Sequence, residues 1–395
     1  MQTAFVIGLG RVGRNHAEAY RDDEGFRLVG VAEVDDERRA RVSDAVGLPT
    51  PNRYTDHETG LAATEPDVVS VATPAAFHTD HVTDALAHDP RVVWCEKPLA
   101  TSVRDGERLV RRADEAGVEL VVNHARRFSE TFETVAEWLH EGRVVGRVQS
   151  VRITTGVELL NLGTHYVDLV LSLLDTRAVR VASASLTRTD DGERFVGGGV
   201  IETESGVTAE IARERRPTHR LEIEGSDGRL SVPLAVGPDV TPTVELWRAD
   251  APGRVTVSDS TSSDTDSASG ETDRPSSETE SADGTEDDGS DRVIDPAALT
   301  ETWEREATRL PDTYEPGFVP AQPLFENGVR HVGRLSDGAA NAAPGRRAVH
   351  GLAVLTALVV ASETGTSVDL PLAAPFRETP LALDPADPVR FDPTD

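Results

Sequence analysis

The chain has 395 residues and a formal net charge of −29, because 40 lysine and arginine residues face 69 aspartate and glutamate residues. At about 100 to 200 residues per domain, this length predicts two or three domains and excludes a peptide hormone or a disulfide miniprotein. So much negative charge repels nucleic acid phosphates and anionic lipid, so neither nucleic acid nor a membrane is expected as a partner.

Two further features bear on the compartment. Cys95 is the single cysteine, which excludes an intramolecular disulfide and a cysteine-rich metal site, and we expect no metal. Residues 1–8 lack the basic segment of a signal peptide, and the longest apolar stretch, at 352–361, is too short to span a bilayer. A cytoplasmic protein is predicted.

Lysine is almost absent from this chain: 39 of the 40 basic residues are arginine, and Lys97 is the exception. An acidic, lysine-poor composition resembles that of proteins from salt-loving archaea, although a GC-rich codon bias would also favour arginine. Arginine can supply positive charge almost anywhere but cannot release a proton near neutral pH. The one remaining lysine is therefore a candidate for a chemical role.

Strand-like and helix-like segments alternate from the N-terminus to residue 123, which predicts a doubly wound parallel sheet of the Rossmann type. We expect the N-terminal domain to span 1–123. The predicted strands are 3–7, 26–32, 68–73, 91–95 and 119–123, and the predicted helices are 14–22, 36–46, 79–88 and 102–116.

The pattern changes after residue 123 and predicts a second, α+β domain over 124–395. Its predicted helices are 130–141, 163–174 and 344–362, and its predicted strands are 147–154, 179–187, 194–203, 208–215, 219–225, 229–233 and 367–370. Residues 258–292 contain 12 acidic residues and no apolar side chain larger than alanine or proline. This segment cannot form a core and is predicted to be a disordered insertion, with a docking segment as the alternative.

The first predicted strand leads into Gly8-Leu9-Gly10-Arg11-Val12-Gly13, which opens a predicted helix. An acidic residue, Glu33, follows 20 residues later at the end of the next strand. This context is the fingerprint of a dinucleotide site, with Gly8 in the tight turn, Gly10 beside the pyrophosphate and Gly13 against the helix. Arg11 and Val12 supply backbone amides at the helix start. A glycine-rich turn in another kind of α/β protein is the alternative.

Glu33 also predicts which dinucleotide binds. Its carboxylate can accept hydrogen bonds from the ribose hydroxyls and repels a 2′-phosphate, so NAD is favoured over NADP. The alternative is that Arg38 and Arg39, one turn further on, fold back toward a phosphate.

Two more motifs follow parallel strands, at the sheet edge where ligands bind in this architecture. The first contains Thr73, Pro74 and His78, and the second is Glu96-Lys97-Pro98. All of these except Pro98 are candidate cofactor-binding residues, and Lys97 is a candidate catalytic and substrate-binding residue. A structural salt bridge is the alternative for Lys97.

A third candidate group lies on one helix. Asn161, His165 and Asp168 have the spacing i, i+4 and i+7, which aligns them on one face of a helix that is otherwise apolar. Three polar side chains on such a face indicate a site. A hydrogen-bonded core histidine is the alternative for His165.

These motifs, together with Asn123 and Arg127-Phe128, resemble the Gfo/Idh/MocA family of oxidoreductases over nearly the whole chain. The resemblance implies a Rossmann domain, a C-terminal domain with an open, mostly antiparallel sheet that supports a dimer or tetramer, and NAD(P)-dependent oxidation of a hydroxyl on a sugar-like substrate. It places Lys97 beside nicotinamide and substrate, and His165 at the position of a histidine in some nucleotide-sugar dehydrogenases. Where inositol dehydrogenase-like members have a histidine four residues beyond the aspartate, this chain has Ser172.

The sequence therefore predicts a dehydrogenase or reductase acting on a secondary hydroxyl or ketone of a sugar, polyol or nucleotide sugar. Lys97 would hold the reacting oxygen, His165 would act as general acid or base, and Asp168 would orient the substrate. Asn123, Arg127 and Asn161 are candidate substrate contacts. Two alternatives are an NAD-dependent lyase or glycosidase that oxidises its substrate transiently, and a non-catalytic dinucleotide-binding regulator.

Overall fold

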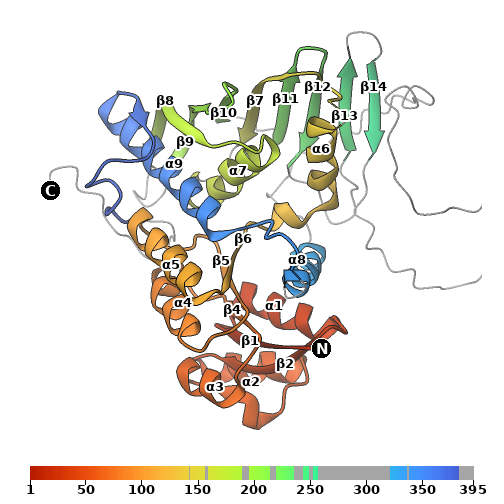
Figure 1. The fold of residues 1–395 in the computed structure, drawn as a ribbon, viewed down its shortest axis with the longest axis vertical. Helices are drawn as coiled ribbons and strands as arrows, with labels where there is room; N and C mark the ends of the chain where they lie inside the picture. The colour runs from red at the N-terminus through yellow and green to blue at the C-terminus, as the bar shows by residue number, and fades with distance from the viewer. Residues whose placement is uncertain are drawn as a thin grey trace, which may run out of the picture.

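The computed structural model describes residues 1–141, 143–155, 159–188, 195–213, 219–234, 243–248, 252–256, 321–335 and 338–381. These residues form two sheets, one at each end of the molecule, with helices between them (Figure 1). The acidic insertion predicted at 258–292 lies outside the described residues.

The N-terminal sheet has the strand order β3-β2-β1-β4-β5-β6, and all neighbouring pairs are parallel. This order, which steps outward from β1 in both directions, confirms the doubly wound prediction. Strands covered on both faces should be apolar throughout, and Ala4, Phe5 and Val6 of β1 are fully buried. The strands are β1 (Gln2–Ile7), β2 (Phe26–Ala32), β3 (Arg53–Tyr54), β4 (Val68–Val71), β5 (Val92–Glu96) and β6 (Glu119–Asn123).

The helices between these strands begin at local capping signals. Asp35, Asp56 and Ser102 each accept a hydrogen bond from the backbone N–H three residues later, at the starts of α2, α3 and α5. The sequence analysis did not predict β3 or α3, because both are short and neither has a clear apolar period. The helices are α1 (Arg11–Asp22), α2 (Asp36–Ala45), α3 (His57–Thr64), α4 (His78–Leu86) and α5 (Val103–Ala116).

The second sheet has the order β14-β13-β12-β11-β7-β10-β9-β8-β15 within the described residues. Strands β7 and β10 pair in parallel and every other neighbouring pair is antiparallel, so the predicted mostly antiparallel sheet is confirmed. The sequence analysis did not predict β13 and β14. The strands are β7 (Val148–Thr155), β8 (Ala178–Arg188), β9 (Phe195–Thr203), β10 (Thr208–Arg213), β11 (Arg220–Gly225), β12 (Gly228–Pro233), β13 (Thr243–Arg248), β14 (Pro252–Thr256) and β15 (Val368–Asp369).

Helices α6 (Glu130–His140), α7 (Leu159–Leu173) and α9 (Gly345–Thr364) lie between the two sheets (Figure 1). By length and composition, α9 is long and apolar enough to cross a membrane, so the sequence argument that the apolar stretch is too short was wrong. However, 72% of its most apolar window is buried inside the molecule. This burial identifies α9 as a core helix.

Helix α8 (Ala321–Leu335) returns to the N-terminal unit and packs against α1 (Figure 1). Phe325, Val329 and Val332 of α8 share a hydrophobic cluster with Tyr20 and Trp94. A segment far along the chain therefore completes the core beside the first sheet. The division into domains 1–123 and 124–395 stays a prediction. Helix α8 crosses this boundary, because it comes from the second range and packs on the first.

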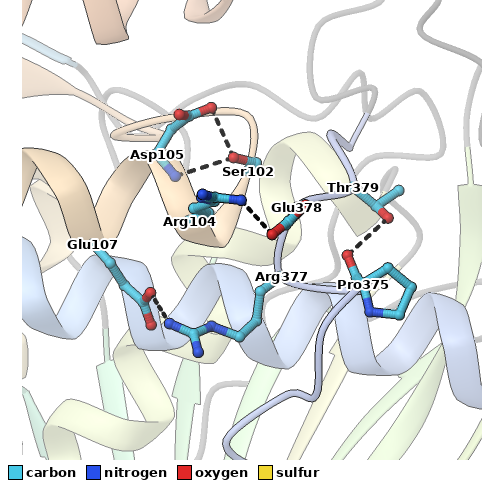
Figure 2. A network of polar contacts seen from close by, with 8 residues as sticks. All are labelled: Ser102, Arg104, Asp105, Glu107, Pro375, Arg377, Glu378 and Thr379. Carbon is cyan, nitrogen blue, oxygen red and sulfur yellow. Dashed lines mark hydrogen bonds and ion pairs between the residues drawn. The ribbon is translucent and has the colours of Figure 1, made fainter.

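A second crossing involves residues 375–381, which lie along α5 (Figure 2). Arg104 pairs with Glu378, and Arg377 pairs with Glu107. Backbone hydrogen bonds accompany these pairs, from Arg104 N–H to the Arg377 carbonyl at 2.8 Å and from Leu381 N–H to the Thr101 carbonyl at 2.9 Å. We call residues 375–381 the C-terminal strap.

Candidate active site

The glycine loop between β1 and α1 is shaped by its glycines. Gly8 has φ +86°, a conformation that side chains disfavour. A Cβ on Gly13 would lie 1.9 Å from the Gly8 carbonyl oxygen, whereas a Cβ on Gly10 would meet nothing within 4 Å. No side chain caps α1, which begins at Arg11 directly after Gly10. The open space at Gly10 and the uncapped helix start fit a dinucleotide pyrophosphate.

Glu33 is buried beside this loop and holds its shape. Its carboxylate accepts hydrogen bonds from Leu9 N–H at 2.8 Å and from Asp35 N–H at 3.1 Å. Lone pairs remain for further donors, such as ribose hydroxyls, since a carboxylate accepts about four hydrogen bonds. Arg38 approaches Glu33 Oε2 at 3.4 Å, and Arg39 donates to the Glu33 carbonyl at 2.6 Å. Arg38 and Arg39 thus both contact Glu33.

Thr73, Pro74 and His78 follow β4, as predicted from the sequence. The two ring nitrogens of His78 lie 2.6 Å from the Pro98 carbonyl oxygen and 2.7 Å from the Thr73 carbonyl oxygen. His78 is fully buried, so these contacts link the segment after β4 to the segment after β5. Its described contacts are with protein backbone, and a direct contact with the cofactor stays a prediction.

Glu96 and Asn123 end the neighbouring strands β5 and β6, and Asn123 Nδ2 donates to Glu96 Oε1 at 2.5 Å. The same carboxylate oxygen lies 2.9 Å from His16 Nε2 of α1. Burial acts to raise the pKa of Glu96, but these hydrogen bonds and the nearby Lys97 together hold it below its usual range. Glu96 therefore stays ionised, directly before Lys97 in the chain, and its hydrogen bonds hold this segment in place.

His165, on α7, is buried, and its Nδ1 has no hydrogen-bond partner among the residues that the structure describes. Burial, reinforced by the positive charges of Lys97 and Arg126 and by His124, lowers the pKa of His165 well below its ordinary value. The imidazole is therefore neutral at neutral pH and able to accept a proton. Lys97 is thus close enough to His165 to influence its pKa, and a shared catalytic role for the two residues stays a prediction.

Asp168, one helical turn after His165, forms a buried two-pronged ion pair with Arg127. Arg127 Nε and Nη2 donate to the two carboxylate oxygens at 2.6 and 2.8 Å. Arg127 Nη1 also donates to Ser172 Oγ at 2.9 Å and to the Ala342 carbonyl at 2.8 Å. Ser172, four residues after Asp168, thus helps to hold this arginine. Direct substrate contact by Asp168 or Arg127 stays a prediction.

Helix α7 begins at Leu159, so Asn161, His165 and Asp168 lie on one helix as predicted. The side chain of Asn161 is outside the described part of the structure. Sequence reasoning missed three site residues: His16, His124 and Arg126. His124 directly follows Asn123, its Nδ1 lies 3.5 Å from Asp168 Oδ1, and its ring meets that of His165 edge to face at 5.7 Å. A histidine at the carboxyl end of a parallel strand was the available signal.

Comparison with known proteins identifies the N-terminal unit. Residues 3–124 match the model of the Gfo/Idh/MocA oxidoreductase family with an NAD-binding Rossmann fold. The chain is 28% identical over 250 residues to D-apiose dehydrogenase of Paraburkholderia graminis, a match that covers 57% of this chain and 66% of that protein. It is 29% identical over 243 residues to D-xylose 1-dehydrogenase (NADP(+)) 2 of Haloferax volcanii, covering 57% and 73% of the two chains.

The similarity in fold covers more of the chain than these sequence matches do. Aldose-aldose oxidoreductase from Caulobacter crescentus, solved with glycerol, superposes with a TM-score of 0.68 and 18% identity, covering 93% of this chain and 99% of that one. At this identity the likeness shows the fold alone. The chain therefore has the fold of this solved oxidoreductase, and its residues 3–124 are similar to the NAD-binding Rossmann fold of the Gfo/Idh/MocA oxidoreductase family.

Proposed function

We propose that this protein is an NAD(H)-dependent dehydrogenase or reductase that acts on a secondary hydroxyl or ketone of a sugar-like substrate. One observation carries the proposal: the single lysine of the chain directly follows a strand of the Rossmann sheet, and its charge helps to lower the pKa of the buried His165. Carbohydrate dehydrogenases among the relatives, named for D-apiose and D-xylose, support the substrate class.

The bound nicotinamide would supply the hydride acceptor or donor. The residues of this chain would handle the oxygen and its proton. Lys97 would hold the reacting oxygen by a hydrogen bond and help to move its proton, and His165 would act as the general base or acid that exchanges this proton. The Arg127–Asp168 pair holds η3 (Ala125–Phe128) to α7, which positions His165. Glu96, hydrogen-bonded to Asn123 and close to His16, fixes the backbone that carries Lys97.

For the cofactor, we propose NAD rather than NADP. The Glu33 carboxylate lies at the end of β2, and a 2′-phosphate there would face its negative charge. The exposed Val34 beside it adds no positive charge. Arg38 is partly neutralised by Glu33 and Asp35, at 3.4 and 3.6 Å. NAD is expected to bind at least tenfold tighter than NADP, about 1.4 kcal/mol, measured by calorimetry. Equal or reversed affinities would contradict this choice.

The test of the function is a panel of sugars, polyols, sugar acids and nucleotide sugars incubated with NAD and NADP in molar KCl, followed by nicotinamide absorbance. Stoichiometric formation of NADH and a ketone or lactone is the expected result. Product formation without net NADH would indicate an enzyme that oxidises its substrate only transiently. Dinucleotide binding with no conversion of any member of the panel would favour a non-catalytic regulator.

A further inference from the structure

Two adjacent arginines of η3 have opposite surroundings. Arg127 is fully engaged by Asp168, Ser172 and a carbonyl. The half-buried Arg126 makes one long hydrogen bond, from Nη2 to the Leu234 carbonyl at 3.3 Å, and its Nε is buried without a partner. Its guanidinium carbon lies 5.5 Å from the centre of the Tyr166 ring. Among the residues that the structure describes, no carboxylate pairs with Arg126.

Arg126 contributes positive charge to the site. Its guanidinium, together with burial, lowers the pKa of His165 and of His219, and Lys97 and His124 also act on His165. The Asp168 carboxylate, which lies near His124, is paired with Arg127. An unpaired cation is costly to keep away from water, so a group of this kind needs a counter-charge.

Arg126 differs from many other arginines of the described structure. The whole protein carries 69 acidic and 40 basic residues, so carboxylates are abundant. Several arginines pair with one, as in Arg152–Glu210 and Arg220–Glu245 on the second sheet, both at 2.7 Å. Within the described residues Arg126 has no such partner, which favours a ligand that brings the negative charge.

We propose that the substrate carries an anionic oxygen group, a carboxylate or a phosphate, and that Arg126 binds it between Tyr166 and the Leu234 carbonyl. The planar fork of a guanidinium matches both groups with two parallel hydrogen bonds. Tyr166 would support the flat face of the guanidinium while its N–H groups point to the ligand. This inference rests on the proposed function and narrows its substrate from sugars in general to acidic sugars.

The experiment compares matched substrates that differ in charge: glucose with glucuronate, gluconate and glucose 6-phosphate, each with NAD at one fixed KCl concentration. The proteins are the wild type, Arg126→Gln, Arg126→Lys and the control Arg112→Gln, which changes an exposed arginine of α5. Thermal unfolding first establishes that the four proteins are equally folded. The uronate and the aldonate separate a carboxylate ligand from the phosphate of the third compound.

We expect the wild type to have a higher kcat/KM for at least one acidic sugar than for glucose. Arg126→Gln should raise KM for that substrate about 30-fold or more, because truncating one partner of a buried charge pair removes most of its contribution. Arg126→Lys should restore part of the loss, and Arg112→Gln should behave as the wild type. The KM for glucose, if it is turned over, should change much less than the KM for the acid in Arg126→Gln, because glucose has no anionic group for the guanidinium to bind.

Two outcomes would overturn the inference: a wild type that prefers glucose to every acidic analogue, or an Arg126→Gln protein that loses neutral and acidic substrates equally. Calorimetry with each acid separates this inference from the proposed function. Binding of an acid that requires Arg126, without oxidation of any substrate, would contradict the dehydrogenase and support the anion site. Oxidation of neutral sugars with no Arg126-dependent binding of an acid would do the opposite.

Discussion

The dinucleotide half and the substrate half of the site differ in how their polar groups are satisfied. In the dinucleotide half, Glu33, His78 and Glu96 each contact two protein groups. In the substrate half, His165 Nδ1 and Arg126 Nε are buried without a partner among the described residues. Orphaned buried groups are rare because each is costly, and they persist where a ligand completes them. The difference is one of degree, since His16 Nδ1 beside Glu96 is also buried without a partner among the described residues. The orphaned groups of the substrate half are the ones that a substrate is expected to complete.

Lys97→Arg should have the largest effect of these substitutions. It should lower turnover, which depends on the substrate half, and leave NAD binding by the dinucleotide half unchanged. Guanidinium is also cationic but cannot release a proton, and its planar fork moves the contact point. We expect kcat to fall by about 10² to 10⁴, with NAD affinity kept. Steady-state kinetics and calorimetry measure the two effects. A variant that retains most of its turnover would leave Lys97 as a structural cation.

Asp168→Asn should destabilise the fold, because it leaves Arg127 buried without its counter-charge. Breaking a buried ion pair from one side costs about 3–5 kcal/mol, measured by urea unfolding. The control is Asp175→Asn, which breaks an exposed pair with Arg347 at 2.6 Å and should cost about 1 kcal/mol or less. Unchanged stability with lost turnover would instead assign Asp168 to the substrate.

Substitutions at two glycines of the dinucleotide half distinguish the packing of the loop from its binding of NAD. A Cβ on Gly13 would collide with the Gly8 carbonyl, so Gly13→Ala should lower the free energy of unfolding by about 1–3 kcal/mol and weaken NAD binding. A Cβ on Gly10 meets open space, so Gly10→Ala should keep the Tm and lose NAD affinity alone. If both variants unfold at the wild-type temperature, the loop is less tightly packed than described.

His350 lies outside the proposed catalytic residues, and it is expected to make the stability of the fold depend on pH. Burial, with the nearby Arg177, lowers its pKa from 6.5 to about 4, and its Nε2 accepts a hydrogen bond from Ala178 N–H at 3.0 Å. The unfolded chain therefore binds a proton that the folded chain refuses, and stability falls as the pH drops from 6.5 toward 4. His350→Asn should reduce the loss between pH 7 and 5 by about 1 kcal/mol. Urea unfolding at both pH values gives the difference, and an unchanged loss would assign the acid sensitivity to other histidines.

The sequence predicted the dinucleotide half better because its signals are local. The glycine loop, Glu33 and the capped helices are each specified by a few neighbouring residues. The substrate half depends on pairings across the chain, such as Arg127 with Asp168, 41 residues apart. From the sequence, Arg127 was the expected contact for a polar or anionic group. Nothing in two consecutive arginines shows which one a distant aspartate will take.

The C-terminal strap and α8 have a consequence for how the dinucleotide enters and leaves. The backbone passes between the two units after Asn123, returns with α8 to pack on α1, and joins them again where residues 375–381 run along α5. A hinge motion that separated the two sheets would have to break the contacts of α8 with α1 and those of residues 375–381 with α5. We therefore expect the product dinucleotide to leave through a local motion of the glycine loop and its neighbours, while the contacts between the two units are kept.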